Sequence, residues 1–142
     1  MSNEKSKPAI DFDIHTLDGE HNSFCDEYYI VAMPKGMSQP NNTDVTQFFS
    51  SGGGHRPIGI ITLDHFFASK MARIVTMDSD YPRRGIGRAL LARTAIFAKG
   101  LGAETLYVNS VDSAIQFYEK QGMMSEPGDP KTLSMSLVNA DK

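Results

Sequence analysis

Cysteine is nearly absent from the sequence, which has Cys25 as its single example among 142 residues. One cysteine allows no intrachain disulfide and excludes clusters of cysteine ligands around a metal. Two of the histidines, His15 and His21, have no companions at the spacing that metal ligands require. We therefore expect no metal site in this protein.

Long apolar runs and a surplus of positive charge are absent as well. No apolar run approaches the length of a membrane span, and the polar segment 1–8 has no part suited to a signal peptide. We expect a cytoplasmic protein of one domain, residues 1–142, with a disordered leader at 1–8. The formal net charge of −3 argues against broad binding of nucleic acid.

The alternation of apolar and polar residues, together with the positions of glycine and proline, predicts an α+β fold. Residues 20–26 have no clear period and are expected to form a loop or a short turn of helix, and residues 65–67 are expected in a turn. The Ser-, Gln- and Asn-rich segment 34–56 is expected to form a long loop with a short helix at 44–49. We predict strands at 11–17, 28–33, 58–63, 71–77, 105–108 and 133–138, and helices at about 85–101 and from Ser110 or Asp112 to 121.

Arginine is concentrated in one part of the chain, since five of the six arginines lie between positions 73 and 93. A local basic patch on an acidic protein indicates a small anionic ligand rather than a polyanion. Within this patch Gly85 and Gly87 follow a predicted strand and open a predicted helix, so that several backbone N–H groups point into one small volume. Such a turn suits a phosphate or pyrophosphate.

The pattern Gly85-x-Gly87 is weak when it is taken alone. A dinucleotide-binding fingerprint would have a third glycine where Leu90 stands, and a Walker loop would continue with Gly-Lys-Ser or Gly-Lys-Thr. The simpler alternative is a glycine turn before a helix, with its arginines in solvent.

A second motif, Ala-x-x-Phe-Tyr-Glu-Lys-x-Gly-Met at residues 114–123, follows in the order and spacing of a known family. Together with residues 82–87 it resembles the GNAT family, the Gcn5-related N-acetyltransferases, over residues 57–138. The resemblance implies a GNAT-like fold with a mixed central sheet of about six to seven strands, flanked by helices and with a reduced N-terminal helical part. Pro82 stands where the family has Gln or Arg, and the shifted match Arg84-x-x-Gly87-x-Ala89 fits the pattern too.

The resemblance also implies roles for individual residues. The backbone N–H of Met77 would meet the acetyl carbonyl, Asn109 would bond the pantetheine arm, and Tyr118 would act as the general acid. The residues implied for binding the pyrophosphate of coenzyme A are Arg83, Arg84, Gly85, Ile86, Gly87, Arg88 and Ala89.

The activity that the resemblance implies is transfer of an acetyl group from acetyl-CoA to a primary amine, by direct attack in a ternary complex and without a metal. The amine is a small molecule, peptide or protein that the sequence does not identify. The general base that would take a proton from this amine is not fixed by the sequence, and the candidates are Asp64, His65, Asp78 and Asp80. Two alternatives stay open: a catalytically weak domain that binds coenzyme A as a sensor or interaction module, and a homodimer in which the second chain completes the acceptor site.

Overall fold

The computed structural model describes residues 12–36, 57–79 and 85–138. The expected leader at 1–8 and the expected short helix at 44–49 lie outside these ranges, as do Arg83 and Arg84. Within them, no helix is long and apolar enough to cross a membrane.

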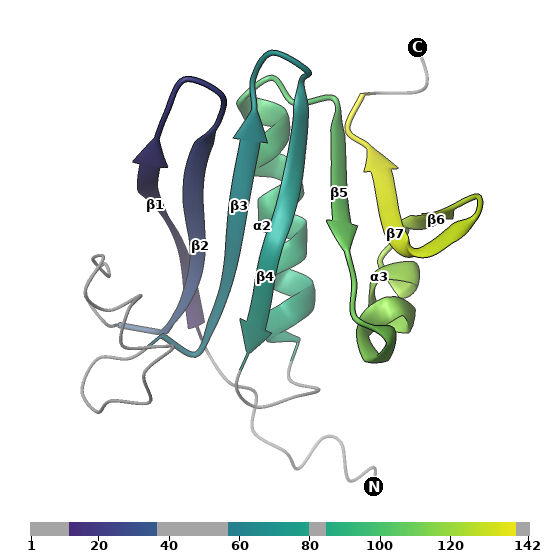
Figure 1. Ribbon diagram of the computed structural model, residues 1–142. Coiled ribbons are helices and arrows are strands. Elements are labelled where there is room, and N and C mark those ends of the chain that lie inside the picture. Colours follow the sequence, from purple (N-terminus) through teal and green to yellow (C-terminus); the bar gives the residue numbers. More distant parts are fainter. Residues whose placement is uncertain (1–11, 37–56, 80–84, 139–142) are drawn as a thin grey trace, which may run out of the picture.

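A single sheet of seven strands organises the chain, in the order β1-β2-β3-β4-β5-β7-β6 (Figure 1). Only β4 and β5 pair in parallel, and the other neighbours are antiparallel. The predicted α+β class with a mixed sheet of six to seven strands is confirmed. The strands are β1 (Phe12–His21), β2 (Asp26–Pro34), β3 (Gly59–Phe66), β4 (Met71–Ser79), β5 (Thr105–Asn109), β6 (Met124–Glu126) and β7 (Asp129–Ser136).

The helix α2 (Ile86–Gly100) connects β4 to β5 and lies across one face of the sheet, against β2, β3 and β4 (Figure 1). Its buried side chains are Ile86, Leu90, Leu91, Thr94 and Ala98, which recur at helical spacing. The apolar pattern of the sequence predicts Leu90, Leu91 and Ala98 on this face but not Ile86 or Thr94. A short 3-10 turn (Asp112–Ala114) leads from β5 into α3 (Ile115–Lys120), beside β6 and β7.

The start of α2 approaches β3 closely because β3 begins with a glycine. A Cβ atom built on Gly59 would lie 2.7 Å from Cγ2 of Ile86 and 2.9 Å from Cδ1 of Leu90. Both neighbours are fully buried, with exposed fractions of 1% and 0%. The absence of a side chain at Gly59 therefore fixes where the first turn of α2 sits on the sheet.

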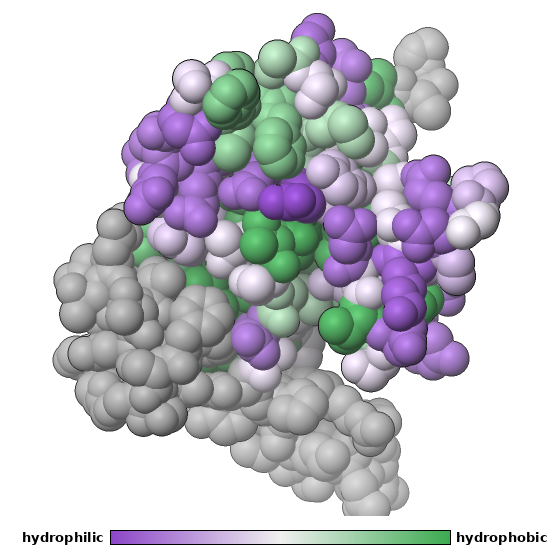
Figure 2. All heavy atoms as spheres, viewed as in Figure 1, coloured by the Kyte–Doolittle hydropathy of each residue, from purple (hydrophilic) through white to green (hydrophobic). Residues whose placement is uncertain are grey.

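The opposite face of the sheet carries both apolar and charged groups. Val31, Met33 and Ile60 form a second buried cluster there. Farther along the same face, Arg73 donates a hydrogen bond to Asp64 at 3.1 Å, between neighbouring strands. Figure 2 shows apolar residues exposed in the middle of this face, next to strongly polar ones.

Four local predictions from the sequence were wrong. The strand β3 continues through His65 and Phe66, which were expected in a turn, and β1 continues to His21. The 3-10 turn has Val111 at its N-cap without a side-chain hydrogen bond, so neither Ser110 nor Asp112 caps it. The strand β6 was missed because it is only three residues long, too short to show a period.

Candidate active site

The two parallel strands β4 and β5 are paired at one end only. Their register runs from Met71 opposite Thr105 to Ile74 opposite Val108 and stops there. At the paired end, the N–H of Glu104 donates to the carbonyl oxygen of Lys70 at 2.7 Å, next to the ion pair of the two side chains at 3.8 Å. The rest of β4 has no partner on this side among the described residues, so the sheet opens toward the start of α2.

A β-bulge at Val75 accompanies this opening. In the register with β3, Thr76 pairs with Thr62 and Ile74 pairs with Leu63, which leaves Val75 as the extra residue of β4. A bulge bends its strand and increases the local twist. Because the bulge follows directly after Ile74, where the pairing with β5 ends, it accounts for the divergence of the two strands. Val75 is 44% exposed as a result.

The opening holds a cavity of about 310 Å³. A second hollow of about 220 Å³ is lined by Arg73, Ile74, Val75 and Asn109, and it shares the last three residues with the larger cavity. The two hollows therefore adjoin where β4 and β5 separate. The larger cavity is lined by Ile74, Val75, Thr76, Met77, Asp78, Val108, Asn109, Ser110, Val111, Ala114 and Tyr118.

Tyr118 reaches this cavity from α3 and is only 4% exposed. Its ring meets that of Phe117 edge to face, with the centroids 5.2 Å apart. Burial raises the pKa of Tyr118 above the ordinary value of 10.0, because the phenolate is poorly solvated there. The hydroxyl group is therefore protonated at neutral pH and can donate a proton or a hydrogen bond into the cavity.

The N-terminus of α2 has the features of an anion site. Gly85, at the N-cap, has a φ of 82°, a left-handed conformation that glycine adopts without strain. The first turn contains no acidic residue, and its N–H groups lack carbonyl partners within the helix. The N–H of Ala89 already donates to the carbonyl oxygen of Gly85 at 3.0 Å, so the amides of Ile86–Arg88 in the first turn are the ones available to an anion.

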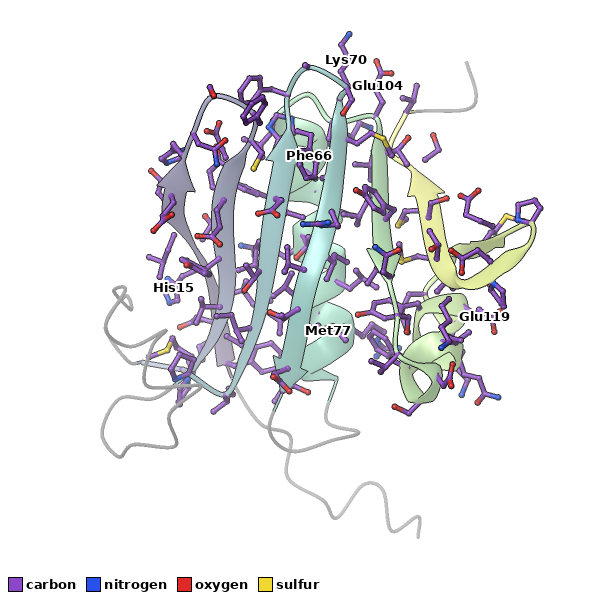
Figure 3. All side chains as sticks on the ribbon, viewed as in Figure 1. His15, Phe66, Lys70, Met77, Glu104 and Glu119 are labelled. Atoms are coloured by element: carbon purple, nitrogen blue, oxygen red, sulfur yellow. The ribbon has the colours of Figure 1, made fainter. Side chains whose placement is uncertain are left out.

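Gly87 joins this helix terminus to the cavity. A Cβ atom built on Gly87 would lie 3.5 Å from the ring of Phe117 and 3.9 Å from Cε of Met77. Figure 3 shows Met77 near the end of β4, in front of the first turns of α2. The helix start, the end of β4 and α3 therefore meet around one glycine.

Asn109 lies at the end of β5 and lines both hollows. Its side-chain oxygen lies 2.9 Å from Thr132 Oγ1, whose single hydroxyl hydrogen is shared with Oδ2 of Asp129 at 2.7 Å. This contact fixes the amide group, and the side-chain nitrogen donates to no other residue in the part of the chain that the structure describes. The amide is thus oriented and available to a ligand in the opening.

The candidate general bases are separated by the structure. His65 is buried, with its ring 6.4 Å from that of Phe67, at the paired end of β4 and β5. Asp64 binds Arg73, and Asp80 lies outside the described residues. Of the three candidates that the structure describes, only Asp78 lines the larger cavity.

The structure brings several predicted site residues together. Met77, Asn109 and Tyr118 line one cavity, and the turn of Gly85 and Gly87 lies beside it. Sequence reasoning missed Phe117 and Val111 as members of this site. Phe117 stands in the second motif beside Tyr118, which was a signal for it, whereas no signal distinguishes the exposed Val111. The described residues contain no group of three or more His, Cys, Asp or Glu side chains that could hold a metal ion.

Comparison with protein families finds one match. The profile of the Acetyltransferase (GNAT) domain matches residues 46–122, which is more than half of the 142 residues. A search of the curated proteins found no match.

Solved structures share the fold at low sequence identity. Elp3 from the archaeon Methanocaldococcus infernus, lacking N-terminal residues 1–46, matches 88% of this chain with a TM-score of 0.63 at 14% identity, and the chain spans 30% of its length. Gcn5 from Tetrahymena matches 82% of this chain with a TM-score of 0.58 at 15% identity, over 72% of its own length. The N-acetyltransferase YhbS from Escherichia coli, solved in complex with CoA, matches 78% with a TM-score of 0.54 at 12% identity, over 59% of its own length.

Proposed function

The chain belongs to the GNAT acetyltransferase family, and from that membership we propose that it transfers the acetyl group of acetyl-CoA to a primary amine. The observation that carries the proposal is the opening between β4 and β5, with a buried tyrosine on one side and a glycine-bearing helix start beside it. Acetyl-CoA supplies the thioester carbonyl carbon that the amine attacks.

In this proposal the start of α2 holds the pyrophosphate of the cofactor. The first-turn amides at 86–88 donate to its oxygens, and the helix dipole adds positive potential there. The side chain of Arg88 is exposed at this end and adds a full charge, as Arg83 and Arg84 are expected to do. Asn109 would bond an amide of the pantetheine arm with its side-chain nitrogen.

Two groups at the cavity would assist the reaction. The backbone N–H of Met77 would stabilise the oxyanion that develops as the amine attacks, and loss of one such donor typically costs about 2.7 to 4 kcal/mol. The hydroxyl group of Tyr118, which is protonated at neutral pH, would donate its proton to the departing thiolate. Direct attack by the amine needs no acyl-enzyme, which leaves Cys25 without a catalytic role.

The second candidate function is a module that binds coenzyme A without transferring its acetyl group. It is favoured by the short connection between β1 and β2, only four residues long. In this connection the side-chain oxygen of Asn22 accepts from the N–H groups of Phe24 and Cys25 at 2.8 and 2.9 Å. This tight turn leaves no room for a helix between β1 and β2, so the N-terminal helical part expected to be reduced has no element here to build an acceptor site.

Two measurements separate these candidates. Calorimetric titration with acetyl-CoA tests whether the cofactor binds, and release of free thiol across a panel of primary amines tests whether the acetyl group is transferred. Binding together with amine-dependent thiol release supports the enzyme. Binding without thiol release on any amine supports the module, and absence of binding refutes both.

A further inference from the structure

The larger cavity has ionisable groups on two different walls. Of its eleven lining residues, only Asp78 and Tyr118 carry a side chain that ionises, and none is basic. Tyr118 belongs to the buried cluster beneath α2, whereas Asp78 pairs with Ile60 of the cluster on the opposite face of the sheet. A proton donor and a carboxylate therefore enter the opening from opposite sides of β4.

The side chain of Asp78 makes neither a hydrogen bond nor an ion pair with any residue in the described part of the chain. The nearest basic residue on its face of β4 is Arg73, which Asp64 holds at 3.1 Å and whose guanidinium carbon lies 5.6 Å from the ring centroid of Phe66. These contacts fix Arg73 in place and neutralise Asp64. Among the described residues, no basic side chain occupies the carboxylate of Asp78.

The alternation of β4 directs Asp78 to the acceptor side. Thr76 lies on the same face and donates to Oγ1 of Thr62 at 3.1 Å, while the side chain of Met77 points the other way, to Gly87. Successive side chains of a strand point to opposite faces. If the cofactor lies on the side of Met77 and α2, a molecule that enters from the other face meets Asp78 first.

We propose that Asp78 receives the ammonium group of the acceptor and makes the site selective for primary amines that are cationic at neutral pH; this rests on the proposed acetyl transfer. One proton of the ammonium passes to the Asp78 carboxylate and on to solvent. The nitrogen lone pair then forms the C–N bond, the C–S bond breaks, and the thiolate takes the proton of the Tyr118 hydroxyl. The second proton lost by the nitrogen returns to the Tyr118 oxygen through solvent, so one proton is released per turnover.

The test compares the wild-type protein with Asp78→Asn on three probe amines. Benzylamine and spermidine are cationic at neutral pH, and aniline is uncharged. For Asp78→Asn we expect KM for benzylamine and spermidine to rise about tenfold, which corresponds to about 1.4 kcal/mol, and kcat with these amines to fall as well, because an amide cannot accept the ammonium proton. The tenfold change is the size of one charged contact. KM for acetyl-CoA and the rate with aniline should stay within about twofold of wild type, because neither molecule makes that contact with Asp78.

The matched control is Glu119→Gln, which makes the same change of charge on α3. Glu119 is exposed and outside the cavity, on the side of α3 that faces away from β4 (Figure 3). This variant should keep the wild-type KM for benzylamine. An equal rise of KM in both variants would mean a general effect of charge and would overturn the role of Asp78.

Equilibrium binding keeps the inference testable without turnover. Benzylammonium chloride and spermidine are titrated into the wild-type protein and Asp78→Asn, both with and without saturating CoA. Binding that weakens about tenfold in the variant supports the role of Asp78, whether or not the protein transfers acetyl groups. The inference is overturned if the amines do not bind to the wild type, or if they bind equally to both proteins. It is also overturned if the wild type acetylates aniline alone, although that result would leave the proposed acetyl transfer standing.

Discussion

The close approach of α2 to β3 at Gly59 gives a prediction whose magnitude follows from the structure. In Gly59→Ala, the new Cβ would lie 2.7 Å from Cγ2 of Ile86 and 2.9 Å from Cδ1 of Leu90. Carbon atoms in contact prefer about 3.5 to 4.0 Å. Because both neighbours are buried, the overlap of almost 1 Å has to be relieved by a shift of the first turn of α2.

We expect this shift to lower the free energy of unfolding by about 1 to 2 kcal/mol. Overpacking a filled core typically costs about 1 to 3 kcal/mol, and the replacement of a strand glycine returns about 0.5 to 1 kcal/mol of that. In a domain of this size such a loss lowers Tm by roughly 2 to 8 °C. The same shift displaces the amides of the anion site, so the affinity for acetyl-CoA should fall as well.

Chemical denaturation and calorimetric titration measure the two effects, and Gly100→Ala is the control. Gly100 ends α2, has no atom within 4 Å of a built Cβ and has no positive φ. That variant should be as stable as wild type or slightly more stable. Ile86→Leu, which removes the closest methyl group, should recover part of the loss when it is combined with Gly59→Ala. If Gly59→Ala and Gly100→Ala have equal stability, the close contact of α2 with β3 is refuted.

Three further predictions concern the cavity and the opposite face of the sheet. Tyr118→Phe should lower kcat by roughly 100-fold, the low end for a general acid, while acetyl-CoA affinity stays within about twofold; unchanged turnover removes Tyr118 from this role. Gly87→Val should weaken acetyl-CoA binding about tenfold, because a branched side chain has no room beside Phe117, whereas Gly87→Ala, whose Cβ makes ordinary contacts, should bind nearly normally. Burial and the hydrogen bond to Glu27 raise the pKa of Tyr29 to about 12. The protonated Tyr29 hydroxyl therefore stabilises the fold below its ordinary pKa of 10.0, and this stabilisation is lost as the pH rises toward 12. Denaturation on either side of pH 10 should show that the free energy of unfolding falls less with pH in Tyr29→Phe than in the wild type. An equal fall in both proteins would contradict this prediction.

The parts of the fold that the sequence predicts correctly are those set by local pattern. The run before the glycines predicts β4, and the apolar spacing at Leu90, Leu91 and Ala98 predicts the buried face of α2. The two matched motifs are far apart in the chain, yet the structure brings Gly87 and Phe117 into contact distance. Their order and spacing were therefore a reliable guide to the fold.

The features that the sequence does not reveal depend on how strands pair. The bulge at Val75 is a property of the register with β3, and the β-branched run through Ile74, Val75 and Thr76 has no gap that would mark it. The burial of His65 follows from the length of β3 and its neighbours, which override the polarity of the residue. The sequence also does not distinguish Asp78 from Asp64 as a candidate base. The structure does, because Asp64 is paired with Arg73 whereas Asp78 lines the cavity.

In the proposed function, coenzyme A binds in the opening between β4 and β5, with its pyrophosphate at the start of α2. The most direct measurement is a titration of 15N-labelled protein with acetyl-CoA, followed through the backbone amide signals in NMR spectra. We expect the largest shifts at Met77, Ile86, Gly87, Arg88 and Asn109, and little change in the turn between β1 and β2. Saturable shifts that avoid these five amides and gather elsewhere on the sheet would contradict it.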